Sequence, residues 1–167
     1  LKPSSTAPLP VHLLYEVLDR AGLPPGALNL VAGSGHEAGD ALVNGGVDGV
    51  AFTGSLEVGN EMIRSAAADR RPVIAEMGSK NPVIVSGEAD LDAAADGVAA
   101  SAFGFSGQKC SAVSRAYVHE SVYGSFMSKL VERTSRITVG DPFQRDTDMG
   151  PVITRQAMDN YLRWTDM

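Results

Sequence analysis

Residues 49–76 read GVAFTGSLEVGNEMIRSAAADRRPVIAE, two short apolar runs separated by a stretch with helical periodicity. The runs 49–53 and 72–76 each predict a buried strand. Four apolar residues between them share one face of a predicted helix: Val58, Met62, Ile63 and Ala66. A strand, a helix and a strand at this spacing are typical of a right-handed βαβ unit with parallel strands. The sequence therefore predicts an α/β fold built on a parallel sheet.

The alternation of helices and strands continues toward the N-terminus. Apolar residues at helical spacing predict a helix over 11–21, which ends at Gly22 and the following prolines. The apolar run 28–32 predicts another strand, and a second helix is expected over 37–44. The first half of the chain thus predicts three strands and the helices that connect them.

The second half of the chain has a different sequence pattern. Strands are predicted over 82–85 and 115–119, with an alanine-rich helix over 91–103 between them. An amphipathic helix follows, and a last helix begins near Thr154. The apolar face of the first of these two helices is expected to contain Val122, Tyr123, Phe126, Met127, Leu130 and Val131. The Gly78-Ser79 break suggests a domain boundary near residues 77–80.

Composition excludes several classes of protein. The 167 residues carry 14 Lys and Arg against 20 Asp and Glu, a net charge of −6 without a basic block, which argues against nucleic-acid or anionic-membrane partners. No apolar run is long enough to span a bilayer. The single cysteine excludes an internal disulfide framework, and the histidines lack metal-ligand spacing, so we expect no metal site. Without a secretory leader, the protein is expected to be cytoplasmic.

Two glycine-containing loops follow predicted strands. Residues 33–39, with glycines at Gly33, Gly35 and Gly39, expose backbone N–H groups that could meet a phosphate. Thr53, Gly54 and Ser55 repeat the arrangement after the next strand. Each loop alone is more often a plain turn, and Ser55 alone a plain helix N-cap. Their occurrence on neighbouring strands favours a nucleotide site.

Two further residues are candidates for chemistry. Glu76 ends a predicted strand, where a partly desolvated carboxylate with a raised pKa would suit a general base. An ion-paired or helix-capping glutamate is the alternative. Cys110 lies on a loop with glycine and small polar residues, and Lys109 beside it favours the nucleophilic thiolate. An inert buried cysteine is the alternative there.

These residues belong to motifs that occur in the order seen in the aldehyde dehydrogenase superfamily. The motifs are Lys2-Pro3-Ser4, Phe52-Thr53-Gly54-Ser55, Glu76-Met77-Gly78-Ser79-Lys80-Asn81-Pro82 and Gly107-Gln108-Lys109-Cys110. The resemblance covers essentially the whole chain. Residues 101–112 and 52–59 are most similar to 1-pyrroline-5-carboxylate dehydrogenases, which oxidise glutamate γ-semialdehyde to glutamate in proline breakdown. The resemblance implies a Rossmann-like NAD(P)-binding part over 1–78 and the front of an α/β catalytic domain over 79–167.

The resemblance also implies roles for individual residues. Cys110 would attack the aldehyde, and Glu76 would activate the water that releases the acid. The residues implied to bind NAD are Lys2, Ser5, Gly35, Gly39, Thr53, Gly54, Ser55, Val58 and Met77. Ser111 would help to bind the α-carboxylate of the semialdehyde. A small-molecule aldehyde is the implied partner, and the full-length protein is expected to be a homo-oligomer.

The sequence departs from the family pattern at two positions. Ser79 replaces the usual second glycine after the catalytic glutamate, so a positive φ there would strain the backbone. Ser5 stands where the family often has a glutamate that binds the adenosine 2′-hydroxyl. Loss of that charge predicts that NADP is tolerated beside NAD.

The family's oxyanion asparagine is expected to precede residue 1, and its ribose-binding glutamate to follow residue 167. We therefore expect the chain to be an internal fragment with little turnover alone. Oxidation of another aldehyde remains an alternative, and so does a non-catalytic nucleotide-binding fragment.

Overall fold

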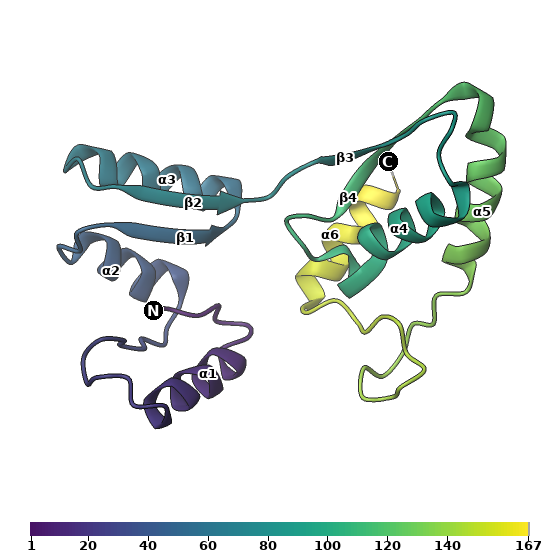
Figure 1. Cartoon of the computed structure of the whole chain (residues 1–167). Helices are drawn as coiled ribbons and strands as arrows, with labels where there is room; N and C mark the ends of the chain where they lie inside the picture. The colour runs from purple at the N-terminus through teal and green to yellow at the C-terminus, as the bar shows by residue number, and fades with distance from the viewer. Residues whose placement is uncertain (167) are drawn as a thin grey trace. The chain divides into compact units, whose positions relative to one another are not determined.

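A computed structural model describes residues 1–166 and divides the chain into two compact units, Leu1–Met77 and the part from Gly78 onward. Figure 1 shows helices alternating with parallel strands in the order of the sequence. The predicted α/β fold class is confirmed, since each unit contains a pair of parallel strands with helices between them.

The first unit contains one βαβ unit, as residues 49–76 predict. Strand β1 (Val50–Gly54) pairs in parallel with β2 (Val73–Met77), and α3 (Leu56–Ala68) connects them. Helix α1 (Leu9–Arg20) precedes a short π-helical turn (Gly35–Gly39) that continues into α2 (Asp40–Asn44). The predicted helices over 11–21 and 37–44 are therefore present.

The strand predicted over 28–32 is wrong. The segment is extended but forms no strand, because its backbone meets only the first residue of the chain. The Leu1 amino group donates to the Asn29 carbonyl at 2.8 Å, and Val31 N–H donates to the Leu1 carbonyl at 2.9 Å. These two bonds have the spacing of a parallel ladder around Leu30 but extend no further.

Helix α3 covers one face of the β1–β2 pair. Met62, Ala66 and Gly59 are its buried residues, one to two turns apart. A Cβ on Gly59 would collide with the Met77 side chain of β2, so a larger residue there would force that side chain to move. Val58 and Ile63, which were expected on the buried face, are 38% and 40% exposed. The helix is therefore rotated toward its small residues, which allow it to approach the sheet closely.

The second unit pairs β3 (Asn81–Val85) in parallel with β4 (Val113–Val118). Helix α4 (Leu91–Phe103) connects them, and α5 (Tyr123–Ser135) and α6 (Arg155–Thr165) follow. Asp90 caps α4 by accepting from Asp92 N–H and Ala93 N–H. Thr154 caps α6 in the same way, which confirms the predicted start of the last helix.

A hydrophobic core lies between the β3–β4 pair and the helices α4 and α5. Its buried members are Val85, Ala95, Val98 and Phe126. Phe126 and Val85 have exposed fractions of 0% and 2%. Of the expected apolar face of α5, Tyr123 and Val131 are more than half exposed. The alanine-rich α4 contributes the small residue Ala95 to this core, next to Phe126 of α5.

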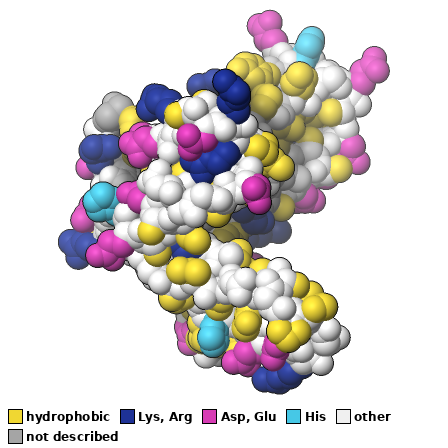
Figure 2. Space-filling model, turned by 90° about the vertical axis from the view of Figure 1, so that its left-hand side faces the viewer, with side chains coloured by type: hydrophobic (Ala, Val, Ile, Leu, Met, Phe, Trp, Pro, Cys, Tyr) yellow, Lys and Arg dark blue, Asp and Glu magenta, His cyan; other side chains and the backbone are white. Residues whose placement is uncertain are grey.

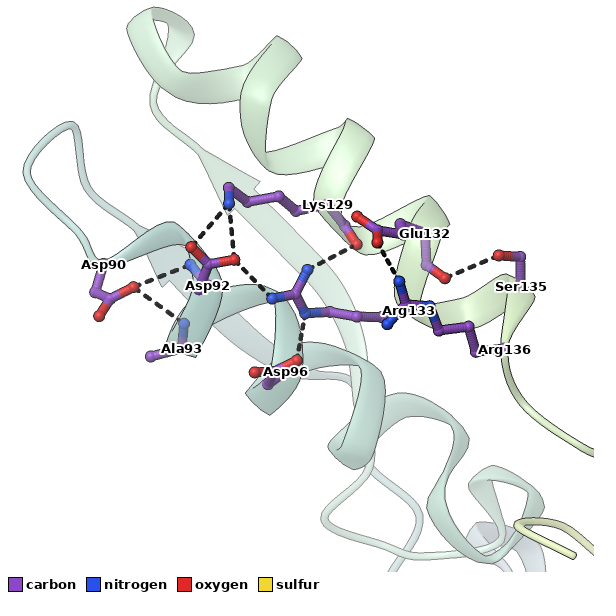
Figure 3. Close-up of polar contacts among 9 residues, drawn as sticks. All are labelled: Asp90, Asp92, Ala93, Asp96, Lys129, Glu132, Arg133, Ser135 and Arg136. Carbon is purple, nitrogen blue, oxygen red and sulfur yellow. Dashed lines mark hydrogen bonds and ion pairs between the residues drawn. The ribbon is translucent and has the colours of Figure 1, made fainter. Parts of the chain in front are cut away.

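Ion pairs join α4 to α5 at the edge of this core, as Figure 3 shows. Asp92 binds Lys129 at 2.7 Å and Arg133 at 2.7 Å, and Arg133 also pairs with Asp96 through Nε. Hydrogen bonds from Lys129 and then from Arg133 hold the pKa of Asp92 below its ordinary value. Asp96 and then Asp92 raise the pKa of Arg133. Both charges are thus favoured in the folded state.

Apolar side chains also lie at the surface. On α1, Leu9, Leu13, Leu14 and Val17 are each more than half exposed. Figure 2 shows hydrophobic side chains in the open among charged ones on the face it presents. Within residues 1–166, no helix is both long and apolar enough to cross a membrane.

Candidate active site

Cys110 lies at the tip of a tight turn that precedes β4. The turn comprises Lys109–Cys110–Ser111–Ala112 and is closed by a bond from Ala112 N–H to the Lys109 carbonyl, 3.2 Å long. Cys110 is a free thiol and is exposed, as is Ser111 beside it. The burial expected under the alternative of an inert cysteine is therefore not found. Lys109 extends back over Gly104, with Nζ 3.6 Å from where a Cβ on that glycine would lie.

The side chain of Asn81 holds this turn. Its Nδ2 donates to the Cys110 carbonyl at 2.6 Å and to the Ala112 carbonyl at 3.3 Å. Asn81 is the first residue of β3 and pairs with Val113, the first residue of β4. The strand register therefore brings an amide from residue 81 to a turn 29 residues later. The binding of these carbonyls by Asn81 was not predicted, because no local sequence pattern marks a contact between residues 29 positions apart.

A left-handed turn connects α4 to the Cys110 turn. Phe105, Ser106 and Gly107 have φ values of 57°, 57° and 66°. Such values are unfavourable for residues other than glycine, so the turn needs contacts to hold it. Ser106 Oγ donates to the Gly150 carbonyl at 3.0 Å, and Gln108 N–H donates to the Phe105 carbonyl at 3.1 Å. The flanking glycines were the only signal of this turn in the sequence.

Glu76 ends β2 in the first unit. Its register partner on β1 is Thr53, and both side chains are exposed. Because side chains alternate along a strand, the two lie on the face opposite to α3. The expected partial desolvation of Glu76 is therefore not found, since no other described element of this unit covers that face. The structure shows neither an ion pair nor a capping bond for Glu76 among the described residues.

Ser55 begins α3 at the carboxyl end of β1. Its hydroxyl accepts from Val58 N–H at 3.3 Å, so Ser55 is the helix N-cap. The N–H groups of Leu56 and Glu57, in the first turn, have no partner inside the helix. The N-terminus of this 13-residue helix is thus open toward an anion, with Val58 partly exposed beside it.

Lys2 lies against the glycine loop of residues 33–39. Its Nζ donates to the Pro3 and Gly33 carbonyls at 2.6 and 3.3 Å, and its Cε is 3.8 Å from where a Cβ on Gly39 would lie. Ser34 Oγ accepts from Glu37 N–H at 3.0 Å, which satisfies one donor of the loop. This loop follows an extended segment and not the strand that was predicted.

The structure also shows the surroundings of four other positions that the sequence singled out. Ser5 and Gly35 are exposed, and a side chain on Gly35 would meet nothing within 4 Å. Met77 packs its side chain against Gly59, so a cofactor contact would use its backbone. Ser79 has no positive φ, so the strain expected at this departure from the family pattern is absent. Among the described residues, no group of three or more His, Cys, Asp or Glu could hold a metal ion.

Known proteins of similar sequence indicate the family of this chain. The aldehyde dehydrogenase family model matches residues 1–167. The chain is 46% identical to a 1-pyrroline-5-carboxylate dehydrogenase of Bacillus cytotoxicus over 98% of its own length and 33% of that protein. It thus spans about a third of the length of the curated relatives it matches.

Solved structures show the same relationship. A 1-pyrroline-5-carboxylate dehydrogenase from Thermus with bound NAD is 35% identical with a TM-score of 0.91, covering 99% of this chain and 33% of that one. Betaine aldehyde dehydrogenase from Staphylococcus aureus in complex with NAD+ is 36% identical with a TM-score of 0.93, again over 99% and 33%. The family match over the full length and the agreement in fold lead to one conclusion: this chain belongs to the aldehyde dehydrogenase family.

Proposed function

We propose that this chain supplies the nucleophile and the base for NAD-dependent oxidation of an aldehyde to a carboxylic acid. The observation that carries the proposal is the exposed Cys110 thiol at the tip of a turn, with its own carbonyl bound by Asn81. A free thiol held in a defined backbone conformation is what covalent attack on a carbonyl needs. Membership of the aldehyde dehydrogenase family supports the same chemistry.

In the proposed reaction, the Cys110 thiolate forms a bond from Sγ to the aldehyde carbon, and the carbonyl oxygen becomes an oxyanion. We propose that the backbone N–H of Cys110 donates to that oxyanion. Bound NAD would supply the hydride acceptor for this carbon, and loss of the hydride would leave the acyl group on Sγ as a thioester. Glu76 then takes a proton from water, the hydroxide attacks the thioester, and the acid and the thiolate are released.

The residues of the first unit fit a dinucleotide. The open N-terminus of α3 at Ser55 offers N–H donors and a partial positive charge to a pyrophosphate. Gly54 precedes Ser55 at a point where a Cβ would meet the Phe52 ring, and Lys2 adds an ammonium beside Gly33 and Gly39. We propose that these residues hold NAD together with Ser5, Gly35, Thr53, Val58 and the Met77 backbone.

The proposed aldehyde is glutamate γ-semialdehyde. Support comes from two curated relatives at 46% identity, both of them 1-pyrroline-5-carboxylate dehydrogenases. Ser111, exposed next to Cys110, is proposed to donate to the α-carboxylate of this substrate.

We also propose that the whole protein assembles as a homo-oligomer. Residues 1–78 would then belong to its NAD(P)-binding domain and residues 79–167 to its catalytic domain.

The decisive experiment compares Cys110→Ser and Glu76→Gln in the complete gene product that carries this chain. Glutamate γ-semialdehyde and propanal are offered with NAD, and NADH is followed by absorbance. We expect no NADH from Cys110→Ser. Glu76→Gln should give one NADH per site and then slow turnover, because the thioester forms but is not hydrolysed. Turnover by Cys110→Ser at the wild-type rate would overturn the proposal. A higher kcat/KM for propanal than for glutamate γ-semialdehyde in the wild type would overturn the proposed substrate.

Cofactor choice is tested at Ser5, which is exposed and uncharged. A 2′-phosphate meets no carboxylate there, so NADP is proposed to be tolerated. Ser5→Glu should lower kcat/KM for NADP about tenfold or more relative to NAD, since a like charge is introduced. An unchanged NAD to NADP ratio would refute this assignment.

A further inference from the structure

Two hydrogen bonds reach the backbone of the Cys110 turn from Asn81 at the start of β3, and a third joins Ser79 to Asn81. Ser79 Oγ lies 3.1 Å from Asn81 Oδ1, and the amide oxygen can only accept, so the hydroxyl donates. The other end of the amide, Nδ2, donates to the Cys110 and Ala112 carbonyls. The chain Ser79–Asn81–Cys110 is therefore a directed series of hydrogen bonds.

The directions are fixed by the donors and acceptors available. If the Asn81 amide were rotated by 180°, Oδ1 would face two carbonyl oxygens and Nδ2 would face the Ser79 hydroxyl. The two carbonyls exclude that rotation, and the Ser79 hydroxyl, which can donate or accept, donates to the amide oxygen that this orientation turns toward it. Asn81 is half-buried whereas Ser79 and Cys110 are exposed, so the amide holds the turn from its inner side.

The two carbonyls that Asn81 binds flank Ser111. Holding both of them restrains the backbone of the turn on either side of that residue, in addition to the bond from Ala112 N–H to the Lys109 carbonyl. Cys110 is thereby restrained at its own carbonyl, one bond from its Cα. A displaced thiol costs rate, because covalent attack depends on alignment to within about 1 Å.

We propose that Ser79 and Asn81 are positioning residues for the Cys110 nucleophile, with Ser79 acting by holding the Asn81 amide in the orientation that the two carbonyls set. This inference rests on the proposed function for its catalytic consequence. It assigns a role to Ser79, the position at which the sequence departs from the family pattern and where glycine would have no hydroxyl. Neither residue touches the reacting atoms.

The test uses Asn81→Asp, Ser79→Ala and Ser79→Thr in the complete gene product. Asn81→Asp keeps the shape but cannot donate to the carbonyls, so kcat should fall about a hundredfold, as a misplacement of about 1 Å produces. Ser79→Ala should lower kcat about threefold to tenfold, and Ser79→Thr, which keeps the hydroxyl, should restore it. KM for NAD should stay within about twofold in all three, because its proposed ligands lie elsewhere.

The matched control is Ser128→Ala, which also removes an exposed serine bond, here from Ser128 Oγ to the Gly124 carbonyl in α5. It should leave kcat unchanged. Urea midpoints measured for each variant separate loss of folding from loss of positioning. Values of kcat within twofold of wild type in both Asn81→Asp and Ser79→Ala would overturn the proposal while leaving the proposed function intact.

A readout that does not depend on activity completes the design. In ¹⁵N NMR spectra, the Asn81 side-chain amide is identified as the pair of signals lost in Asn81→Asp. We expect these protons to be protected from solvent exchange in the wild type and to exchange faster in Ser79→Ala. If Cys110→Ser remained active, the proposed function would fail, and this measurement would still decide whether Ser79 orients the amide; equal exchange rates would show that it does not.

Discussion

The second unit buries Phe126 and Val85 almost completely and joins α4 to α5 through three ion pairs. The first unit buries Val43, Met62 and Ala66, and leaves Ile74 of β2 66% exposed on the open face of its sheet. Parallel sheets are normally covered on both faces. The second unit leaves Ile84 of β3 80% exposed in the same way, so the two units differ in their cores and not in the openness of their sheets. Among the described residues, the part with Cys110 closes around a fully buried aromatic side chain, whereas the part with the glycine loops buries smaller ones. Four substitutions test this contrast.

The largest effect is expected from Phe126→Ala. The side chain is fully buried, and removing it should cost about 3–5 kcal/mol of unfolding free energy. Hydrogen exchange measured by peptide should show the loss across the second unit, with residues 1–77 little changed. The control is Phe143→Ala, whose side chain is 93% exposed and which should change stability by less than about 0.5 kcal/mol. Equal loss of protection in both units would disprove the contrast.

Gly107→Ala tests the left-handed turn of the second unit. Its φ is 66°, and a Cβ would lie 2.9 Å from the Ala102 carbonyl oxygen. We expect a loss of about 1–3 kcal/mol, measured by urea unfolding, with faster proteolysis near residue 107. Gly124→Ala is the control, because a Cβ there meets nothing within 4 Å inside α5 and should be neutral or stabilising. Equal effects of the two variants would argue against a strained turn.

Ser55→Ala tests the first unit at the start of α3. Loss of the bond from Val58 N–H should cost about 1 kcal/mol and increase exchange in α3. Ser55→Asp keeps an acceptor for that bond and should retain stability, yet its charge should weaken NAD binding, as measured by calorimetry. If Ser55→Asp bound NAD as tightly as the wild type, the pyrophosphate would not lie at this helix.

The smallest effect concerns the ion pairs of Asp92. Because the pKa of Asp92 is lowered in the folded state, its contribution is present above the ordinary value of 3.8 and is lost as the pH falls through the lowered pKa. The melting temperatures of wild type and Asp92→Asn should therefore differ at pH 7 and converge in acid. High salt should also reduce the difference. Asp159→Asn, which removes one exposed pair on α6, is the control; a larger effect there would contradict the role of the network.

Local patterns in the sequence predicted most of the fold. The alanine-rich stretch 91–103 and the strand–helix–strand stretch 49–76 form the predicted elements, because their periodicity and end signals act within a few residues. The segment 28–32 has the same apolar character but lacks a neighbouring strand to complete a ladder. A strand depends on its partner, which periodicity alone does not supply.

For the same reason, the sequence singled out the candidate-site residues that lie in local motifs and missed those that make contacts over long separations. Motifs identified Cys110, Glu76 and the glycine loops, since these residues are close in sequence to the glycines that accompany them. Asn81 and Ser106 act over separations of 29 and 44 residues, and no local signal marks either. The rotation of α3, which exposes Val58, depends on the contact between Gly59 and Met77. Such contacts become visible only when the strands are paired.

The bond from Ser106 to the Gly150 carbonyl has a consequence for the order of folding. It spans 44 residues, whereas α4 closes its own bonds over four. On a ribosome the bond cannot form before residue 150 has been synthesised, so the segment that leads to the thiol waits for sequence that follows it. During that interval, the nascent chain carries the Cys110 sulfur on a loop that still lacks one of its anchoring hydrogen bonds.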